Sequence, residues 1–112
     1  MTFNQFDVVV VPFPFTDTSG TKKRPALILS DAVTFNTFLR RSVMAMITTT
    51  THSPWVLDVS ISDLRSAGLR TTSMVRMKLF TLDDALVLRQ IGTSAESDKV
   101  AVKQALQQLF KL

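Results

Sequence analysis

Three consecutive cations, Lys22, Lys23 and Arg24, stand immediately before Pro25 and an apolar stretch. A planar guanidinium can bind a phosphate through two parallel N–H bonds, and it stays charged at any working pH. The residue before a proline has a restricted backbone, so Arg24 is held more firmly than an ordinary loop cation. The run therefore indicates a phosphate-binding position. The alternative is a solvated basic loop that merely flanks a strand.

A second group of polar side chains lies in the segment "ITTTTH", residues 47–52. The hydroxyls of Thr48 and Thr49 can hold phosphate or sugar oxygens. His52 is the only imidazole in the chain, and imidazole suits proton transfer near neutral pH. The alternatives are structural: threonine is common in strands, and a histidine beside Ser53 and Pro54 is typical of a loop.

Arg76 and Lys78 form a third group, because they alternate with apolar residues and so share one face of a predicted strand. Buried without partners, two cations would be very costly. They must therefore face water, an anionic ligand, or an acid such as Asp7 or Asp58. A half-exposed strand face is the structural alternative.

Aromatic and turn-forming residues lie close to the first group. Phe13 and Phe15 flank Pro14 and are the best candidates for stacking on unpaired bases, although most aromatic residues of the chain are expected in the core. Ser19 and Gly20 mark the turn of an exposed loop.

These groups need a scaffold, and short β-rich segments predict one. Strands are expected at 7–13, 24–30, 42–50, 54–61, 71–80 and 86–91, with a helical turn at 31–41 and a second turn begun by Asp63 and stopped by Gly68. Pro12 and Pro14 should end the first strand or place it at an edge. A C-terminal helix is expected, with Thr93 and Glu96 as a capping box and an apolar stripe at Val102, Leu106, Leu109 and Phe110. The pattern predicts one mainly β domain over residues 1–112, a small barrel or strongly curved sheet closed by a helix.

Composition limits the function further. The chain has 112 residues, a formal net charge of +4 and a pI of about 10, which favours an anionic partner. It contains no cysteine and one histidine, so a transition-metal site is not expected. No apolar run approaches the ~20 residues of a membrane span, and the N-terminus lacks the features of a signal peptide, so a cytoplasmic protein is expected. Dinucleotide, Walker A, nucleophile-elbow and zinc-protease motifs are absent, and no cofactor is expected.

The order of "FDVVVVPFPFTDTSGTKKRPALILS", "AMITTT", "GLRTTSMVRMKLFTLD" and an amphipathic C-terminal helix resembles the PemK/MazF toxins of type II toxin–antitoxin systems. The likeness extends over nearly the whole chain. It implies an SH3-like barrel of the MazF/PemK/CcdB type, a homodimer, and metal-independent cleavage of single-stranded mRNA at short sequences. It also implies growth inhibition, and neutralisation by a cognate acidic antitoxin that occupies the RNA groove.

The resemblance carries over to individual residues. The family's arginine at the scissile phosphate matches Arg24, the threonine that ends its "A-x-I-T" strand matches Thr48, and the arginine of its "T-T-x-x-V-R" segment matches Arg76. Two positions depart from the pattern: Phe6 stands where a glycine usually precedes the acid, and Lys78 stands where PemK-type members carry an aspartate proposed as a base.

The expected mechanism is attack of the RNA 2′-OH on its own phosphate, which gives a 2′,3′-cyclic phosphate and a 5′-OH. Arg24 would stabilise the developing charge and Thr48 would fix an oxygen. Arg76 and Lys78 complete the expected catalytic set, with Lys78 ahead of His52 as the candidate proton acceptor. Further RNA contacts are expected from Lys22, Lys23, Thr49, Ser19, Phe15 and His52. The alternatives are a CcdB-like toxin that binds DNA gyrase without catalysis, and a barrel that only binds RNA or an acidic protein.

Overall fold

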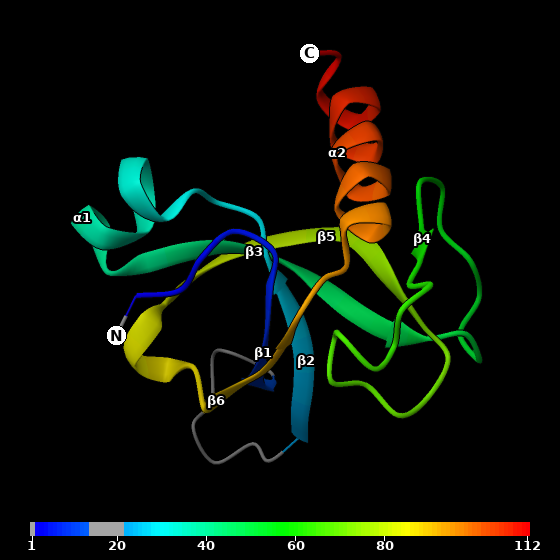
Figure 1. Ribbon diagram of the computed structural model, residues 1–112, viewed down its shortest axis with the longest axis horizontal. Helices are drawn as coiled ribbons and strands as arrows, with labels where there is room; N and C mark the ends of the chain where they lie inside the picture. The colour runs from blue at the N-terminus through cyan, green and yellow to red at the C-terminus, as the bar shows by residue number, and fades with distance from the viewer. Residues whose placement is uncertain (1, 14–21) are drawn as a thin grey trace.

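The computed structural model describes residues 2–13 and 22–112, and within these residues six strands form one antiparallel sheet (Figure 1). The strands run in the spatial order β4-β5-β3-β2-β1-β6. Their bounds are β1 Asp7–Phe13, β2 Lys22–Ile28, β3 Arg41–Thr49, β4 Val59–Ser60, β5 Ser73–Asp83 and β6 Arg89–Thr93. The helical segments are η1 Ala32–Asn36, α1 Thr37–Leu39, η2 Asp84–Leu86 and α2 Glu96–Phe110. The sheet curls into a half-barrel, and α2 follows it at the C-terminal end of the chain, as expected for a mainly β protein.

Both faces of the sheet are packed, and β2 shows this most directly. Leu27 and Leu29 belong to one buried cluster, whereas Ala26 and Ile28 belong to another. Successive strand residues point to opposite faces, so the two clusters lie on the two sides of the sheet. Burial on both faces explains why β1 is a nearly unbroken run of valines.

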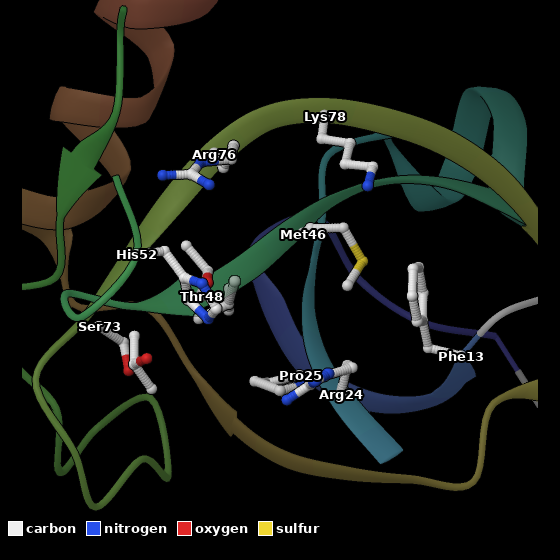
Figure 2. A pocket seen from close by; sticks show the side chains of 11 residues that line it. Phe13, Arg24, Pro25, Met46, Thr48, His52, Ser73, Arg76 and Lys78 are labelled. Atoms are coloured by element: carbon white, nitrogen blue, oxygen red, sulfur yellow. The ribbon is translucent and has the colours of Figure 1, made fainter. Parts of the chain in front are cut away.

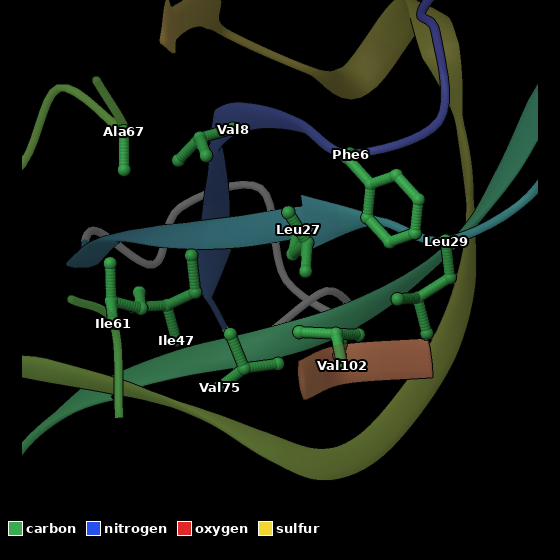
Figure 3. Packing of buried hydrophobic residues seen from close by; sticks show 10 residues of the cluster. Phe6, Val8, Leu27, Leu29, Ile47, Ile61, Ala67, Val75 and Val102 are labelled. Carbon is green, nitrogen blue, oxygen red and sulfur yellow. The ribbon is translucent and has the colours of Figure 1, made fainter. Parts of the chain in front are cut away.

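The first cluster lies under the C-terminal helix, and we call its side of the sheet the helix face (Figure 3). Val102 of α2 is fully buried against strand residues such as Val8, Leu27 and Val75. Ile61 and Ala67, from the segment between β4 and β5, close the same cluster. Burying a side chain of this size typically contributes about 1.5–3 kcal/mol.

The second cluster lies on the other side, which we call the site face. Its members are Phe3, Val9, Val11, Ala26, Ile28, Met44 and Leu82. Before Ala26 on β2 and beyond Met44 on β3, the same alternation places polar and charged side chains such as Arg24 and Thr48 on this face, and the candidate site lies there.

Several predicted boundaries are confirmed and others are wrong. The first strand is found as predicted, and its pairing with β6 stops at Val10, so Pro12 lies beyond that partner. The strand expected at 54–61 is wrong except for Val59–Ser60. Leu57 has a φ of 70°, outside the strand region, and Asp58 accepts a hydrogen bond from the Trp55 N–H, so the segment is a loop. The last strand starts at Arg89 because the residues before it form η2.

The C-terminal helix is confirmed, but the predicted capping box is wrong. The Thr93 hydroxyl donates to Asp7 instead, and α2 begins after Ala95 without a side-chain cap. Val102 is buried and Leu106 packs against the helix-face cluster, whereas Leu109 and Phe110 are 39% and 55% exposed. Figure 1 shows the reason, because α2 rises away from the sheet toward its C-terminus.

The turn at residues 63–68 is also confirmed. The Asp63 side chain accepts a hydrogen bond from the Ser66 N–H, and Gly68 has a φ of 74° where the turn ends. Among the described residues, no helix combines the length and the apolar character that crossing a membrane requires.

Candidate RNA-binding site

A hollow of about 270 Å³ lies on the site face, beyond the end of the apolar cluster (Figure 2). We call it the site hollow. It is lined by Phe13, Arg24, Pro25, Met46, Ile47, Thr48, Thr49, His52, Ser73, Arg76 and Lys78. The described lining holds two arginines, a lysine and a histidine but no carboxylate. Such a lining suits a negatively charged ligand.

Arg24 reaches the hollow because of its position in β2. Its backbone pairs with Val11 of β1, whereas the pairing of β2 with β3 ends at Ala26. Arg24 therefore lies just beyond the closed part of the sheet, half-buried, on the same face as Ala26 and Ile28. Pro25 has no N–H, so the missing strand partner leaves no unpaired backbone donor at that residue. Arg24 thus lies in a strand directly before Pro25, as the sequence predicted.

Thr48 and Thr49 reach the hollow from the end of β3, between β2 and β5. Both are half-buried, and they pair with Met74 and Ser73 of β5. The Thr49 hydroxyl is 2.8 Å from the Thr51 hydroxyl. Figure 2 shows Thr48 on the floor between Arg24 on one side and Arg76 on the other. A ligand atom in the hollow would thus meet a hydroxyl and cations together.

Arg76 is the most constrained cation of the site. Its Nε and Nη2 donate to the two carboxylate oxygens of Asp58 at 3.2 and 3.1 Å, and Nη2 also donates to the Ser53 carbonyl at 2.7 Å. The guanidinium carbon lies 4.9 Å from the centroid of the Trp55 ring. Only 11% of the Arg76 side chain and 10% of the Asp58 side chain are exposed. Of the partners that the sequence left open for Arg76, the structure selects Asp58.

This ion pair shifts the titration of Asp58. Burial by itself raises the pKa of the carboxyl group, but the hydrogen bonds from Arg76 and from the Trp55 N–H outweigh it. The net effect holds the pKa of Asp58 below its ordinary value. Asp58 is therefore ionised at neutral pH, and the buried Arg76 has its counter-charge.

Lys78 and His52 border the hollow as exposed side chains. The Lys78 ammonium lies 5.5 Å from the centroid of the Phe13 ring. His52 lies on the loop between β3 and β4, next to Ser53, whose carbonyl oxygen binds Arg76. The Arg76–Asp58 pair therefore connects the strand floor to the loop that carries the imidazole.

Other predicted RNA contacts do not lie in the hollow. Lys22 is exposed at the start of β2 and is not part of the described lining. Lys23 points to the opposite face of the sheet and borders a different hollow. Ser19 and Phe15 lie outside the described residues. Of the predicted site residues, the structure thus brings together Arg24, Thr48, Thr49, His52, Arg76 and Lys78.

The matching family model is that of the PemK-like, MazF-like toxin of type II toxin–antitoxin systems, and it covers residues 4–110. The chain belongs to this family. The resemblance inferred from the sequence is therefore confirmed. A comparison with curated protein sequences finds no significant match.

Solved structures of MazF toxins share the fold. The toxin MazF-mt6 of Mycobacterium tuberculosis is 26% identical, with a TM-score of 0.75 over 95% of this chain and 97% of that chain. A MazE–MazF structure from Deinococcus radiodurans is 18% identical, with a TM-score of 0.76 over 100% and 98%. An endoribonuclease in complex with its cognate antitoxin, from a mycobacterial species, is 15% identical, with a TM-score of 0.75 over 99% and 95%. The curled sheet with its C-terminal helix is thus the fold of the PemK/MazF toxins.

Sequence reasoning missed four lining residues of this PemK/MazF toxin, namely Pro25, Met46, Ile47 and Ser73. Met46 carries a usable signal, because it lies two residues from Thr48 on the same strand and therefore on the same face. Ser73 carries no such signal. No group of three or more histidine, cysteine or acidic side chains is placed to hold a metal ion in the part of the chain that the structure describes.

Proposed function

We propose that this PemK/MazF toxin is a metal-independent endoribonuclease that cleaves single-stranded mRNA at short sequences and so inhibits growth. The observation that carries the proposal is the grouping of Arg24, Thr48 and Lys78 around one hollow whose described lining contains no carboxylate. Cations and hydroxyls bind phosphate well, whereas hard metal ions prefer carboxylate and carbonyl oxygens. An mRNA substrate would place the activity in the cytoplasm.

RNA supplies its own nucleophile, so the protein must align it and stabilise charge. The 2′-oxygen attacks the adjacent phosphorus while its proton passes to an acceptor. The bond from phosphorus to the 5′-oxygen breaks, and that oxygen takes up a proton. The products are a 2′,3′-cyclic phosphate and a 5′-OH. In this scheme Arg24 binds the phosphoryl oxygens as negative charge develops, and Thr48 donates to one of them.

The chemistry of the two side chains favours His52 over Lys78 as the proton acceptor, in contrast to the order expected from the sequence. Imidazole can accept a proton near neutral pH, whereas an ammonium group has no lone pair to offer. His52 borders the hollow on a loop that Arg76 and Asp58 hold in place. Arg76 then acts mainly as a positioning residue for this loop, because its Nε and Nη2 already bind Asp58 and Ser53. Lys78 is left as a phosphate contact.

A cognate acidic antitoxin is the proposed protein partner. One related structure contains MazE together with MazF, and another is an endoribonuclease in complex with its cognate antitoxin. The net charge of +4 and the acid-free lining of the site hollow would suit an acidic segment that covers the RNA site. We also propose that the toxin is a homodimer.

The deciding experiment is incubation of the purified protein with long single-stranded RNA in EDTA, followed by analysis of the fragment ends. We expect fragments with 2′,3′-cyclic phosphate and 5′-OH ends. The Arg24→Ala variant should cleave about 10²–10³-fold more slowly, because one charge-stabilising donor is lost. Lys22→Ala is the matched control, since this neighbouring cation lies outside the site hollow.

The other outcomes separate the competing functions. Intact RNA with the wild-type protein would remove the endoribonuclease. Salt-sensitive RNA binding without cleavage would then support the RNA-binding alternative, which the absence of an acidic base among the described lining residues favours. Equal cleavage by the wild type and by Arg24→Ala would leave an enzyme but remove Arg24 from its mechanism.

A further inference from the structure

A second hollow, which we call the basic hollow, lies near the same end of β2 on the helix-face side. Its volume is about 670 Å³, and it shares Pro25 with the site hollow. Lys23, Arg70, Arg89 and Gln90 border it, and none of its described lining residues is acidic. The proposed site does not use these side chains, apart from the general expectation that Lys23 binds RNA.

The three cations are available for a ligand. Lys23, Arg70 and Arg89 are exposed, and none of them forms an ion pair within residues 2–13 and 22–112. Arg89 also borders a neighbouring hollow lined by Asp83 and Asp84, but Asp83 is paired with Arg41 and Asp84 is buried and accepts from the Ser42 hydroxyl. Like charges gathered without acids repel one another, and a bound polyanion relieves this repulsion.

The sheet opens between the two hollows. The pairing of β2 with β3 stops at Ala26, whereas the pairing of β2 with β1 continues to Lys22. Beyond Ala26 the edge of β2 that faces β3 therefore has no strand partner, and Pro25 lies on that edge. Figure 2 shows Pro25 beside Arg24 at the border of the site hollow. Because residues alternate along β2, Arg24 serves one hollow and Lys23 the other.

We infer that the basic hollow binds phosphates of the same RNA strand whose scissile phosphate lies at Arg24, so that the strand passes Pro25 from one hollow to the other. The inference rests on the proposed function. The site hollow, at about 270 Å³, is smaller than the ~300–1,000 Å³ typical of pockets that enclose a small ligand, so a polymer must extend out of it. The basic hollow is an exit at which successive phosphates meet unpaired cations.

The test measures how affinity depends on RNA length. The probes are fluorescein-labelled 2′-O-methyl RNAs of about 5 and about 20 nucleotides, which lack the nucleophile and bracket the usual site sizes of single-strand binders. Fluorescence anisotropy gives Kd for the wild type, for K23Q/R70Q/R89Q and for the control K99Q/K103Q/K111Q, whose residues lie on α2 or directly after it. Each variant removes three of the 13 Lys and Arg residues, so the net charges match.

We expect K23Q/R70Q/R89Q to lower the affinity for the long RNA relative to the short one by about tenfold or more. The slope of log K against log salt for the long RNA should decrease by about 2, since each phosphate contact to a single strand contributes about 0.7. The control should keep the wild-type ratio. Thermal unfolding confirms that each variant is folded.

The inference is overturned if the ratio is unchanged in K23Q/R70Q/R89Q, or if the control lowers it equally. It is also overturned if that variant keeps the RNA ratio but loses binding to poly-glutamate, because the hollow then serves an acidic polypeptide. Cleavage of unmodified RNA is measured in parallel. If the wild type cleaves RNA but K23Q/R70Q/R89Q leaves the ratio of long-RNA to short-RNA affinity unchanged, only this inference is removed. If that variant lowers the ratio but the wild type does not cleave RNA, the endoribonuclease is removed and the binding surface remains.

Discussion

The three Arg and Lys side chains of the site hollow differ in how free they are to bind a ligand. Arg24 is half-buried at a strand end, Lys78 is exposed above an aromatic ring, and Arg76 is buried in an ion pair with Asp58. Because the Nε and Nη2 of Arg76 are engaged, its guanidinium has fewer donors left for an incoming phosphate. A half-exposed one can form the bidentate contact that stabilises a transition state. Arg24 is therefore the better choice for charge stabilisation.

His52 can be tested as the proton acceptor at the same scale. We expect His52→Ala to lower the cleavage rate by about 10²-fold or more, the usual contribution of a positioned general base. Added imidazole should restore part of this rate, because it can occupy the space of the lost ring. Lys78→Ala should weaken RNA binding more than it slows the chemical step. A rate that imidazole does not restore, together with a larger loss of chemistry in Lys78→Ala, would transfer the role to Lys78.

A buried ion pair attaches the loop between β3 and β4 to the sheet. Asp58 bonds both Arg76 and the Trp55 N–H, and Arg76 bonds the Ser53 carbonyl. Removing one partner of such a pair leaves a buried charge without compensation. The pKa of Asp58 is lowered in the folded protein, so its charge contributes stability above its ordinary pKa of 3.8. That contribution is lost as the pH falls through the lowered value.

Asp58→Asn should therefore lower the free energy of unfolding at pH 7 by about 2–3 kcal/mol, since the amide keeps an acceptor but loses the charge. The difference from the wild type should narrow as the pH falls below about 4. Chemical denaturation at pH 7 and pH 3 measures both quantities.

Asp83→Asn is the matched control. Its ion pair with Arg41 has side chains that are 50% and 56% exposed, so it should cost less than about 1 kcal/mol. Equal losses in the two variants, or a difference that does not depend on pH, would contradict a buried, charge-dependent attachment of the loop.

At the scale of the molecule, one curled sheet carries an apolar cluster on each face and the site hollow beside one of them. The helix face is filled by apolar side chains under α2, whereas the site face is apolar at one end and charged at the other. The buried residues of β2 and β3 pack in the apolar cluster of the site face, and the same two strands carry Arg24 and Thr48 to the site hollow. A small site of this kind on one chain is consistent with a substrate groove completed by a second copy.

The proposed homodimer gives the prediction at this scale. Light scattering during size-exclusion chromatography should give twice the chain mass of 12.5 kDa, and the value should fall toward the monomer on dilution. A constant mass of one chain at all concentrations, with RNA cleavage retained, would show that one copy suffices.

Much of this architecture followed from local patterns. The two-residue period of a strand made three features predictable: the alternation in β2, the valine run of β1, and the placement of Arg76 and Lys78 on the same face. The positive charge and the family resemblance were also predictable, because both depend only on the residue types and their order. The capping box at Thr93 was wrong because Asp7, 86 residues away, binds the same hydroxyl.

The sequence alone was thus enough to predict most strands, the faces on which their side chains lie, the net charge and the family. Which side chains contact one another was decided by the tertiary structure. Asp58 rather than Asp7 binds Arg76, and Lys23 and Arg24 separate onto opposite sides of the sheet. His52 enters the site only because its loop closes back onto β5. These choices depend on contacts between segments distant in sequence, where competing partners differ by a few kcal/mol of burial and hydrogen bonding. The local sequence pattern carries no information about this competition between partners, so only the tertiary structure decides it.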